Sequence, residues 1–198
     1  VLAAVEKEES PFALHFAAGV SQRLPNADGR KLARLVEWRI LDTDEPNLAL
    51  AGWYAVQKAL AGTDREADWN DFLEHARHPL IGRNIARYLV AAAPAGKRDE
   101  RLAFLVSFLD ETKLGSSQVP VLAGVQEALA SLRECPEPKG WGEVYAELSK
   151  SELEEVRTRA ESLAVLFGNA KALADLKARA ADAIAAPAAR AAAIELLA

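Results

Sequence analysis

The chain is 198 residues long, and its composition is that of a folded, helix-rich protein. Hydrophobic residues make up 51% and charged residues 27%, which excludes intrinsic disorder, and an aromatic share of 7% is low for a β-sandwich. A net charge of -5 argues against nucleic acid as the main partner, because phosphate binding needs concentrated Lys and Arg. The single cysteine, Cys135, excludes an intrachain disulfide and a thiolate metal cage.

Helical patterns follow one another from the N-terminus with short breaks. Ser10-Pro11 predicts a first helix, in which Phe12, Phe16 and Val20 form an apolar stripe at helical spacing. Further helices are expected to begin near Asp28, at Pro46, before Trp69 and Phe72, and at Pro79. Gly62 is expected to end the helix from Pro46, with a positive φ angle.

The second half continues in the same way. Apolar residues at helical spacing predict four helices, carrying Leu102, Leu105, Phe108 and Leu109; Val119, Leu122, Val125 and Leu129; Trp141 and Tyr145; and Val156, Ala160, Leu163 and Phe167. Gly168 ends the last of these, Asn169 caps a helix through Leu173 and Leu176, and Pro187 begins the final one. No stretch shows sustained strand alternation, and none is long and apolar enough to span a bilayer.

Two spacings indicate internal repeats. Pro11, Pro46 and Pro79 begin alternate helices at intervals of 35 and 33 residues, the length of a two-helix repeat. An Arg-x-x-Ala-x-x-Leu pattern occurs at Arg157, Arg190 and Arg83. Its alanine allows a partner helix to approach, its leucine fills the seam, and its arginine is expected to reach the loop carboxylates or carbonyls of a neighbouring repeat.

These patterns predict an all-α, HEAT/ARM-like right-handed α-solenoid of about five helix pairs. We expect residues 1–198 to form a single helical-repeat domain, with a weak internal break near 136–140, where Pro136, Pro138 and Gly140 stand. Because the chain begins and ends inside helical patterns and contains no methionine, we interpret it as a piece of a longer protein. The alternative is a non-repetitive helical bundle with chance spacings.

No catalytic or cofactor-binding residue is predicted. The sequence holds no P-loop, no GxSxG and no CxxCH motif, so the chain is expected not to be an enzyme. His75 and His78 are the only candidate pair of metal ligands, and Glu74 or Asp71 would have to supply a third. Histidine at a helix end is also an ordinary partner of the helix dipole, so no metal is predicted.

The four tryptophans are large for a chain built mainly of Ala and Leu, and most are expected in the core. Trp and Arg are also the residues that dominate protein interfaces. A protein-interaction surface is therefore predicted from Trp38, Trp53, Arg83, Arg87 and Trp141.

Two segments resemble a known family. Residues 47–55, Asn-Leu-Ala-Leu-Ala-Gly-Trp-Tyr-Ala, resemble an Asn-Leu-Pro-Leu-x-x-Trp-Tyr-Ala element, and an Arg-rich helix follows at 81–90. Leu122, Gly124, Ala128 and Leu129, with Pro138 and Trp141 after them, resemble the Leu-x-Gly-x-x-x-Ala-Leu element that comes next. Both elements are similar to the helical middle region of PVC-type haem-binding CxxCH proteins.

The resemblance implies a large exported or periplasmic protein, with a propeller resembling sugar dehydrogenases before the repeats and a c-type haem domain after them. This chain would then be the spacer, and haem c would bind elsewhere. The expected partners are proteins, with no nucleic acid and no membrane insertion. Two alternatives remain: a HEAT-like DNA-binding or DNA-glycosylase-type enzyme with a basic, aromatic concave face, and a small-molecule-binding HEAT protein with a tryptophan-lined pocket.

Overall fold

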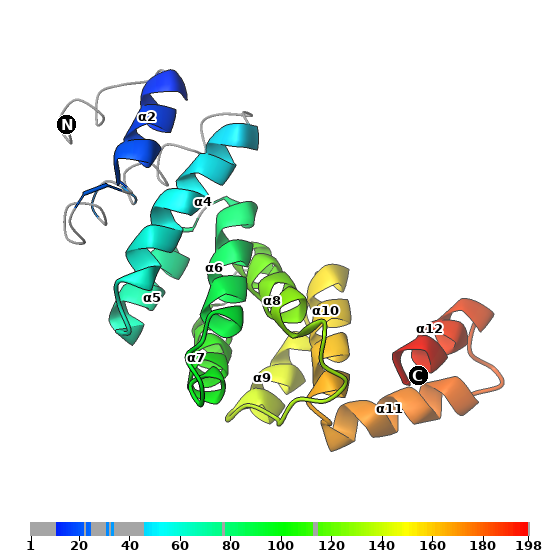
Figure 1. The fold of residues 1–198 in the computed structure, drawn as a ribbon. Helices are drawn as coiled ribbons and strands as arrows, with labels where there is room; N and C mark the ends of the chain where they lie inside the picture. The colour runs from blue at the N-terminus through cyan, green and yellow to red at the C-terminus, as the bar shows by residue number, and fades with distance from the viewer. Residues whose placement is uncertain are drawn as a thin grey trace.

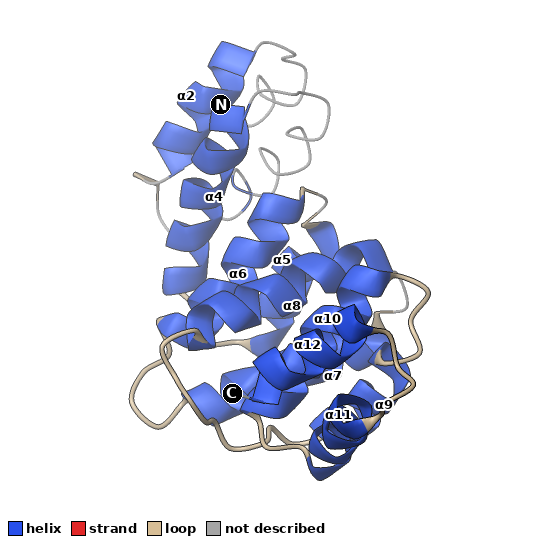
Figure 2. Ribbon diagram, turned by 90° about the vertical axis from the view of Figure 1, so that its right-hand side faces the viewer, coloured by secondary structure: helices blue, strands red, loops and turns tan. Residues whose placement is uncertain are grey.

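The described part of the protein is helical. The computed structural model describes residues 11–21, 23–24, 31, 33, 46–76, 78–112 and 115–197, with ten α-helices and no strand among them (Figure 2). The helices are α2 (Pro11–Ser21), α4 (Pro46–Ala61), α5 (Glu66–His75), α6 (Pro79–Ala91), α7 (Arg98–Glu111), α8 (Gly115–Leu129), α9 (Trp141–Leu148), α10 (Glu154–Leu166), α11 (Ala170–Ala181) and α12 (Pro187–Leu197). The helix predicted near Asp28 lies outside the described residues except at positions 31 and 33.

The helices are arranged in two rows. Along one row α2 contacts α4, α4 contacts α6, α6 contacts α8 and α8 contacts α10 (Figure 1). The second row holds α5, α7 and α9, each in contact with helices of the first row, and α7 also contacts α9. The helices α11 and α12 pack on each other at the C-terminal end. The all-helical prediction is confirmed, and the two rows are consistent with an α-solenoid-like fold.

Several helix boundaries fall where the sequence predicts them. Helices begin at Pro46, Pro79 and Pro187, and the side chain of Asn169 caps α11 by accepting a hydrogen bond from the Ala172 amide at 3.1 Å. Gly168 follows α10 with a φ of 68°. Gly62 follows the end of α4 as predicted, but the prediction of a positive φ angle there is wrong. Among the described residues, positive φ angles occur at Gly96, Gly140 and Gly168.

The two most closely packed helices are α6 and α8, and small residues make this possible. A Cβ added at Gly124 would overlap the main-chain oxygen of Arg83 and would lie 2.9 Å from the Cβ of Ala86. The alanines of the repeated pattern are buried as predicted, with Ala86 and Ala160 at 0% and Ala193 at 1% exposure. Small residues on facing ridges let two helix backbones approach in this way.

The arginines of the repeated pattern differ in their partners: Arg83 reaches the Glu127 carboxylate of α8 at 3.5 Å, whereas Arg157 contacts only its own helix pair. Arg157 donates from Nη1 to the carbonyls of Ser151 and Glu152, at 2.5 and 3.0 Å. Both carbonyls belong to the loop just before its own helix, so Arg157 closes that loop and does not bridge to the next pair.

One apolar core extends through most of the described chain. One cluster of buried apolar side chains extends from Ala17 in α2 to Ala172 in α11. It includes Cys135 and Trp141, on either side of the segment at 136–140, and the Cys135 amide donates to the Leu166 carbonyl at 3.0 Å. The stripe predicted for α2 is wrong at Phe16, which is 65% exposed while Ala17 is buried. None of the described helices has the length and apolar character needed to cross a lipid bilayer.

Candidate functional site

The tryptophans predicted for an interaction surface lie in the core. Trp53 is 5% exposed and meets Tyr88 edge to face, with ring centroids 6.1 Å apart. Trp141 is 1% exposed and packs against Phe167 in the same way, at 5.1 Å. These large rings fill space between helices made mostly of small residues. The prediction that Trp53 and Trp141 belong to an interaction surface is therefore wrong. Trp38 lies outside the described residues.

The predicted arginines are on the surface. Arg83 and Arg87 stand one turn apart on α6, with side chains 44% and 48% exposed. Glu127 of α8 lies between them, with carboxylate-to-guanidinium distances of 3.5 Å to Arg83 and 3.9 Å to Arg87. The pair is therefore partly neutralised across the α6–α8 seam, and its role in binding a partner stays a prediction.

The two candidate metal ligands take part in local contacts at helix ends. His75 Nδ1 lies 2.7 Å from the Asp71 carbonyl, in the last turn of α5. His78 caps α6, its Nδ1 accepting a hydrogen bond from the Leu80 amide at 3.2 Å, and burial lowers the pKa of this imidazole. Within the described ranges, no group of three or more His, Cys, Asp or Glu side chains is placed to hold a metal ion.

Cys135 is a buried thiol. It is 6% exposed, and burial raises its pKa, with a smaller contribution from the Asp99 carboxylate. A thiol with a raised pKa is a poor nucleophile because little thiolate forms near neutral pH.

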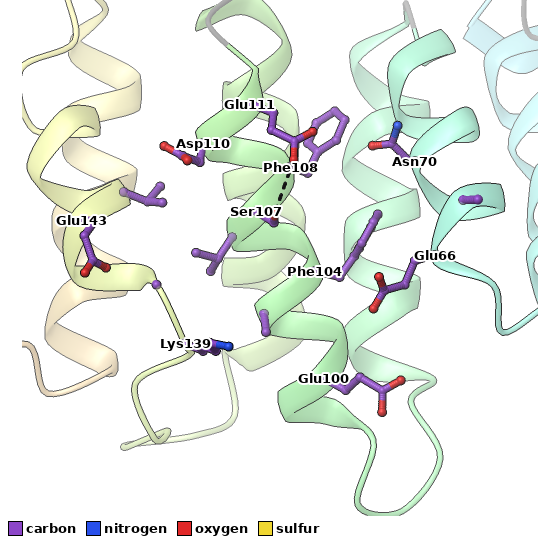
Figure 3. Close-up of a pocket in the computed structure, with 15 residues that line it drawn as sticks. Glu66, Asn70, Glu100, Phe104, Ser107, Phe108, Asp110, Glu111, Lys139 and Glu143 are labelled. Carbon is purple, nitrogen blue, oxygen red and sulfur yellow. Dashed lines mark hydrogen bonds between the residues drawn. The ribbon is translucent and has the colours of Figure 1, made fainter.

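The structure reveals a groove that the sequence analysis missed. It has a volume of about 740 Å³ and runs over α7, between α5 on one side and α9 on the other (Figure 3). We call it the α5–α7–α9 groove; its lining residues are Glu66, Ala67, Asn70, Glu100, Ala103, Phe104, Val106, Ser107, Phe108, Asp110, Glu111, Lys139, Gly140, Glu143 and Val144.

The rim of the groove is acidic. Five carboxylates line it, from Glu66, Glu100, Asp110, Glu111 and Glu143, against the one ammonium group of Lys139. All five carboxylate residues are exposed. Glu100 also pairs with Lys97 at 2.6 Å, and Glu111 accepts a hydrogen bond from Ser107 at 3.5 Å.

The floor of the groove is apolar and firmly supported. Phe104 projects from α7 towards α5 and is half-buried, while Val106, Phe108 and Val144 are buried. The ring of Phe104 meets that of Trp69 edge to face, with centroids 5.3 Å apart. Because Trp69 is itself 2% exposed, the floor rests on the core and keeps its shape without a ligand.

A partial signal for this groove is present in the sequence. Glu66, Glu100 and Glu143 each stand in the first turn of a helix, and these three helices are the neighbours that line the groove. First-turn acids are usually explained by the helix dipole, which hides any further role. Only the tertiary arrangement shows that they share one face.

Comparisons of the chain with family models, with curated proteins and with solved structures find no match in any of the three.

Proposed function

We propose that the chain is a non-enzymatic helical-repeat scaffold that binds protein through the exposed face of its second helix row. One observation carries the proposal: the α5–α7–α9 groove is assembled from helices of successive pairs and joins an apolar floor to a charged rim. An apolar centre with a polar rim is the usual anatomy of a protein interface. Stacked helix pairs supply such extended surfaces because each pair needs contacts only with its neighbours.

The positions of the side chains most often used in catalysis support binding rather than catalysis at this groove. His75, His78 and Cys135 lie outside the groove. The lining carboxylates share the groove with no histidine, cysteine or arginine among the described lining residues. An acidic groove also weighs against duplex DNA as the partner of this face, since phosphates would be repelled.

The narrower proposal is a HEAT-type repeat that separates a propeller dehydrogenase-like domain from a c-type haem domain in an exported protein. It rests on the elements at 47–55 and 122–141 and on the Arg-x-x-Ala-x-x-Leu pattern. Residues of these elements contribute to helix packing in the structure: Trp53 and Trp141 are core residues, and Gly124 permits the close α6–α8 contact. The haem and dehydrogenase sites would both lie outside this chain.

The first test is the complete gene. A propeller before the repeats and a CxxCH segment after them, in one reading frame, would support the spacer proposal. A gene without either would remove it and leave only the general scaffold.

The second test addresses binding itself. The complete protein is treated in its native extract with a carboxylate-to-lysine cross-linker, and the cross-linked peptides are identified by mass spectrometry. The scaffold proposal expects cross-links from α5, α7 or α9 to another domain or another protein. Cross-links confined to this chain, such as one between Lys97 and Glu100, with none to any other polypeptide would overturn it.

A further inference from the structure

We propose that the α5–α7–α9 groove binds a cationic, amphipathic segment of a protein, with Lys and Arg side chains on the rim carboxylates and apolar side chains against the floor. This inference rests on the proposed scaffold function and adds the chemistry of the partner. It depends on four features of the groove: the position of the acids, the mixed character of the lining, the wide spacing of the charges and the rigid floor.

The acids at the C-terminal end of α7 stand where the helix dipole disfavours them. Asp110 and Glu111 occupy the last turn, where the negative end of the helix dipole disfavours carboxylates, and no basic residue stands in that turn. Two exposed acids in an unfavourable position add to the negative potential of the groove. A cationic partner would offset the cost of placing them there.

Carboxylates stand at both ends of the groove, and Lys139 is the one cation among its described lining residues. Glu66 and Glu100 lie near the N-terminal ends of α5 and α7, Glu143 lies at the start of α9, and Glu111 lies at the opposite end of α7 (Figure 3). A compact cation would meet only part of this set at one time. A polypeptide segment with several Lys or Arg residues can meet all of it, which makes an extended partner the better match in charge.

Because the floor of the groove is apolar, we expect the partner to carry apolar side chains as well as cationic ones. Among the apolar lining residues, Ala103 and Phe104 are partly exposed and offer contact area to the partner. Burying part of the exposed edge of Phe104 would add a hydrophobic contribution that a hydrophilic polycation does not obtain. Aromatic side chains on a rigid support are common anchor points in protein interfaces.

The test uses the 198-residue chain and a defined probe. The probe is a fluorescein-labelled peptide made of Lys and Leu at amphipathic helix spacing, and a peptide with Glu in place of Lys serves as its control. Binding is followed by fluorescence anisotropy at low and at physiological salt. We expect the Lys peptide to bind, with an affinity that falls as the salt concentration rises. The Glu peptide should not bind.

Matched variants separate the groove from the overall charge. Glu66→Gln, Glu111→Gln and Glu143→Gln are combined in one protein, and Glu134→Gln, Asp175→Asn and Glu195→Gln in another. Both sets remove three exposed carboxylates, and only the first set lines the groove. The first should weaken binding about tenfold, since three exposed ion pairs are lost, and the second by less than about twofold. Circular dichroism confirms that both remain folded.

The outcomes distinguish this inference from the scaffold proposal. Equal weakening by the two sets would mean that the peptide responds to net charge only, and the inference would fail. Equal binding of Lys-Leu and Lys-Ser peptides would remove the amphipathic part of the proposal and overturn it as stated. If the peptide does not bind but cross-links from the complete protein still map to α5, α7 or α9, the partner is not a cationic amphipathic segment, and the scaffold function stands. Absence of both the peptide binding and the cross-links would overturn both proposals.

Discussion

The guanidinium of Arg101 lies over the indole ring of Trp69, with its Cζ atom 5.0 Å from the ring centroid. The same group donates from Nη1 to the Leu89 carbonyl at 3.1 Å and from Nη2 to the Asp64 carboxylate at 3.0 Å. Leu89 lies in the last turn of α6, where carbonyls lack a helical partner. One buried side chain therefore connects α7 to the end of α6, to α5 and to the loop before α5.

Replacing this arginine should destabilise the fold well beyond the loss of an ion pair. Arg101→Met leaves the Leu89 carbonyl without its donor and removes the cation–π contact, so the free energy of unfolding should fall by about 2–3 kcal/mol. Asp64→Asn removes only an exposed carboxylate and should cost less than about 1 kcal/mol. Urea unfolding followed by circular dichroism measures both. Equal losses for the two variants would show that the salt bridge is the main contribution.

The close contact of α6 and α8 makes a second prediction. Gly124→Ala should lower the free energy of unfolding by about 1–3 kcal/mol, because the added methyl group overlaps the main-chain oxygen of Arg83. Helix propensity alone would predict the opposite sign, a gain of about 1 kcal/mol.

A matched control exists in the same chain. Gly19 lies inside α2, and a Cβ added there would meet nothing within 4 Å. Gly19→Ala should therefore stabilise the protein by about 0.5–1 kcal/mol. A lower thermal midpoint for Gly124→Ala with a higher one for Gly19→Ala would confirm that helix packing determines the effect at Gly124. Higher midpoints for both variants would contradict the close α6–α8 contact.

The sequence predicted the boundaries of the helices better than it predicted which side chains are exposed. Helix boundaries at Pro79, Gly168 and Asn169 depend on neighbouring residues only, so local rules are sufficient for them. The exposure of Phe16 and the burial of Trp141 depend on which helices lie against them, and periodicity does not contain that information. The groove was missed for the same reason, since its three helices are separated in the sequence and meet only through tertiary packing.

The cap of α6 should make stability depend on pH. His78 accepts its hydrogen bond through Nδ1, which must be unprotonated, and burial holds the folded-state pKa below the ordinary value of 6.5. The unfolded chain therefore takes up the proton first as pH falls below about 6.5, and the free energy of unfolding should decline from there until the folded-state pKa is passed. Above about pH 7.5 both states are neutral and His78 adds no pH dependence.

Substitutions at His78 separate capping from titration. His78→Asn keeps a capping acceptor without a titrating group, so the decline between pH 7.5 and 5.5 should become shallower. His78→Ala should lose about 1 kcal/mol at pH 7.5 and less at pH 5.5, where the parent protein has itself lost part of the contribution of this cap. Urea midpoints at these two pH values provide the measurement, and an unchanged slope in His78→Asn would assign the pH dependence to other groups.

The cap of α11 allows a charge-swap prediction. Asn169 accepts from the Ala172 amide through Oδ1 and donates through Nδ2 to the Glu137 carboxylate at 3.1 Å, with only 8% of the residue exposed. Aspartate caps helices as well as asparagine does, so Asn169→Asp keeps the cap. It also places a second carboxylate against Glu137, and we expect a loss of about 1–2 kcal/mol at pH 7.

A compensating substitution decides whether that loss comes from the Glu137 contact. Glu137→Gln provides an amide that can donate to the new aspartate, so the double variant should recover most of the stability lost by Asn169→Asp. The single variant should also approach the parent protein as pH falls from 7 towards 5, because the two facing carboxylates raise each other's pKa and then share a proton. Denaturant midpoints across this range test both expectations, and a double variant no more stable than the single one would show that the loss arises at the helix cap itself.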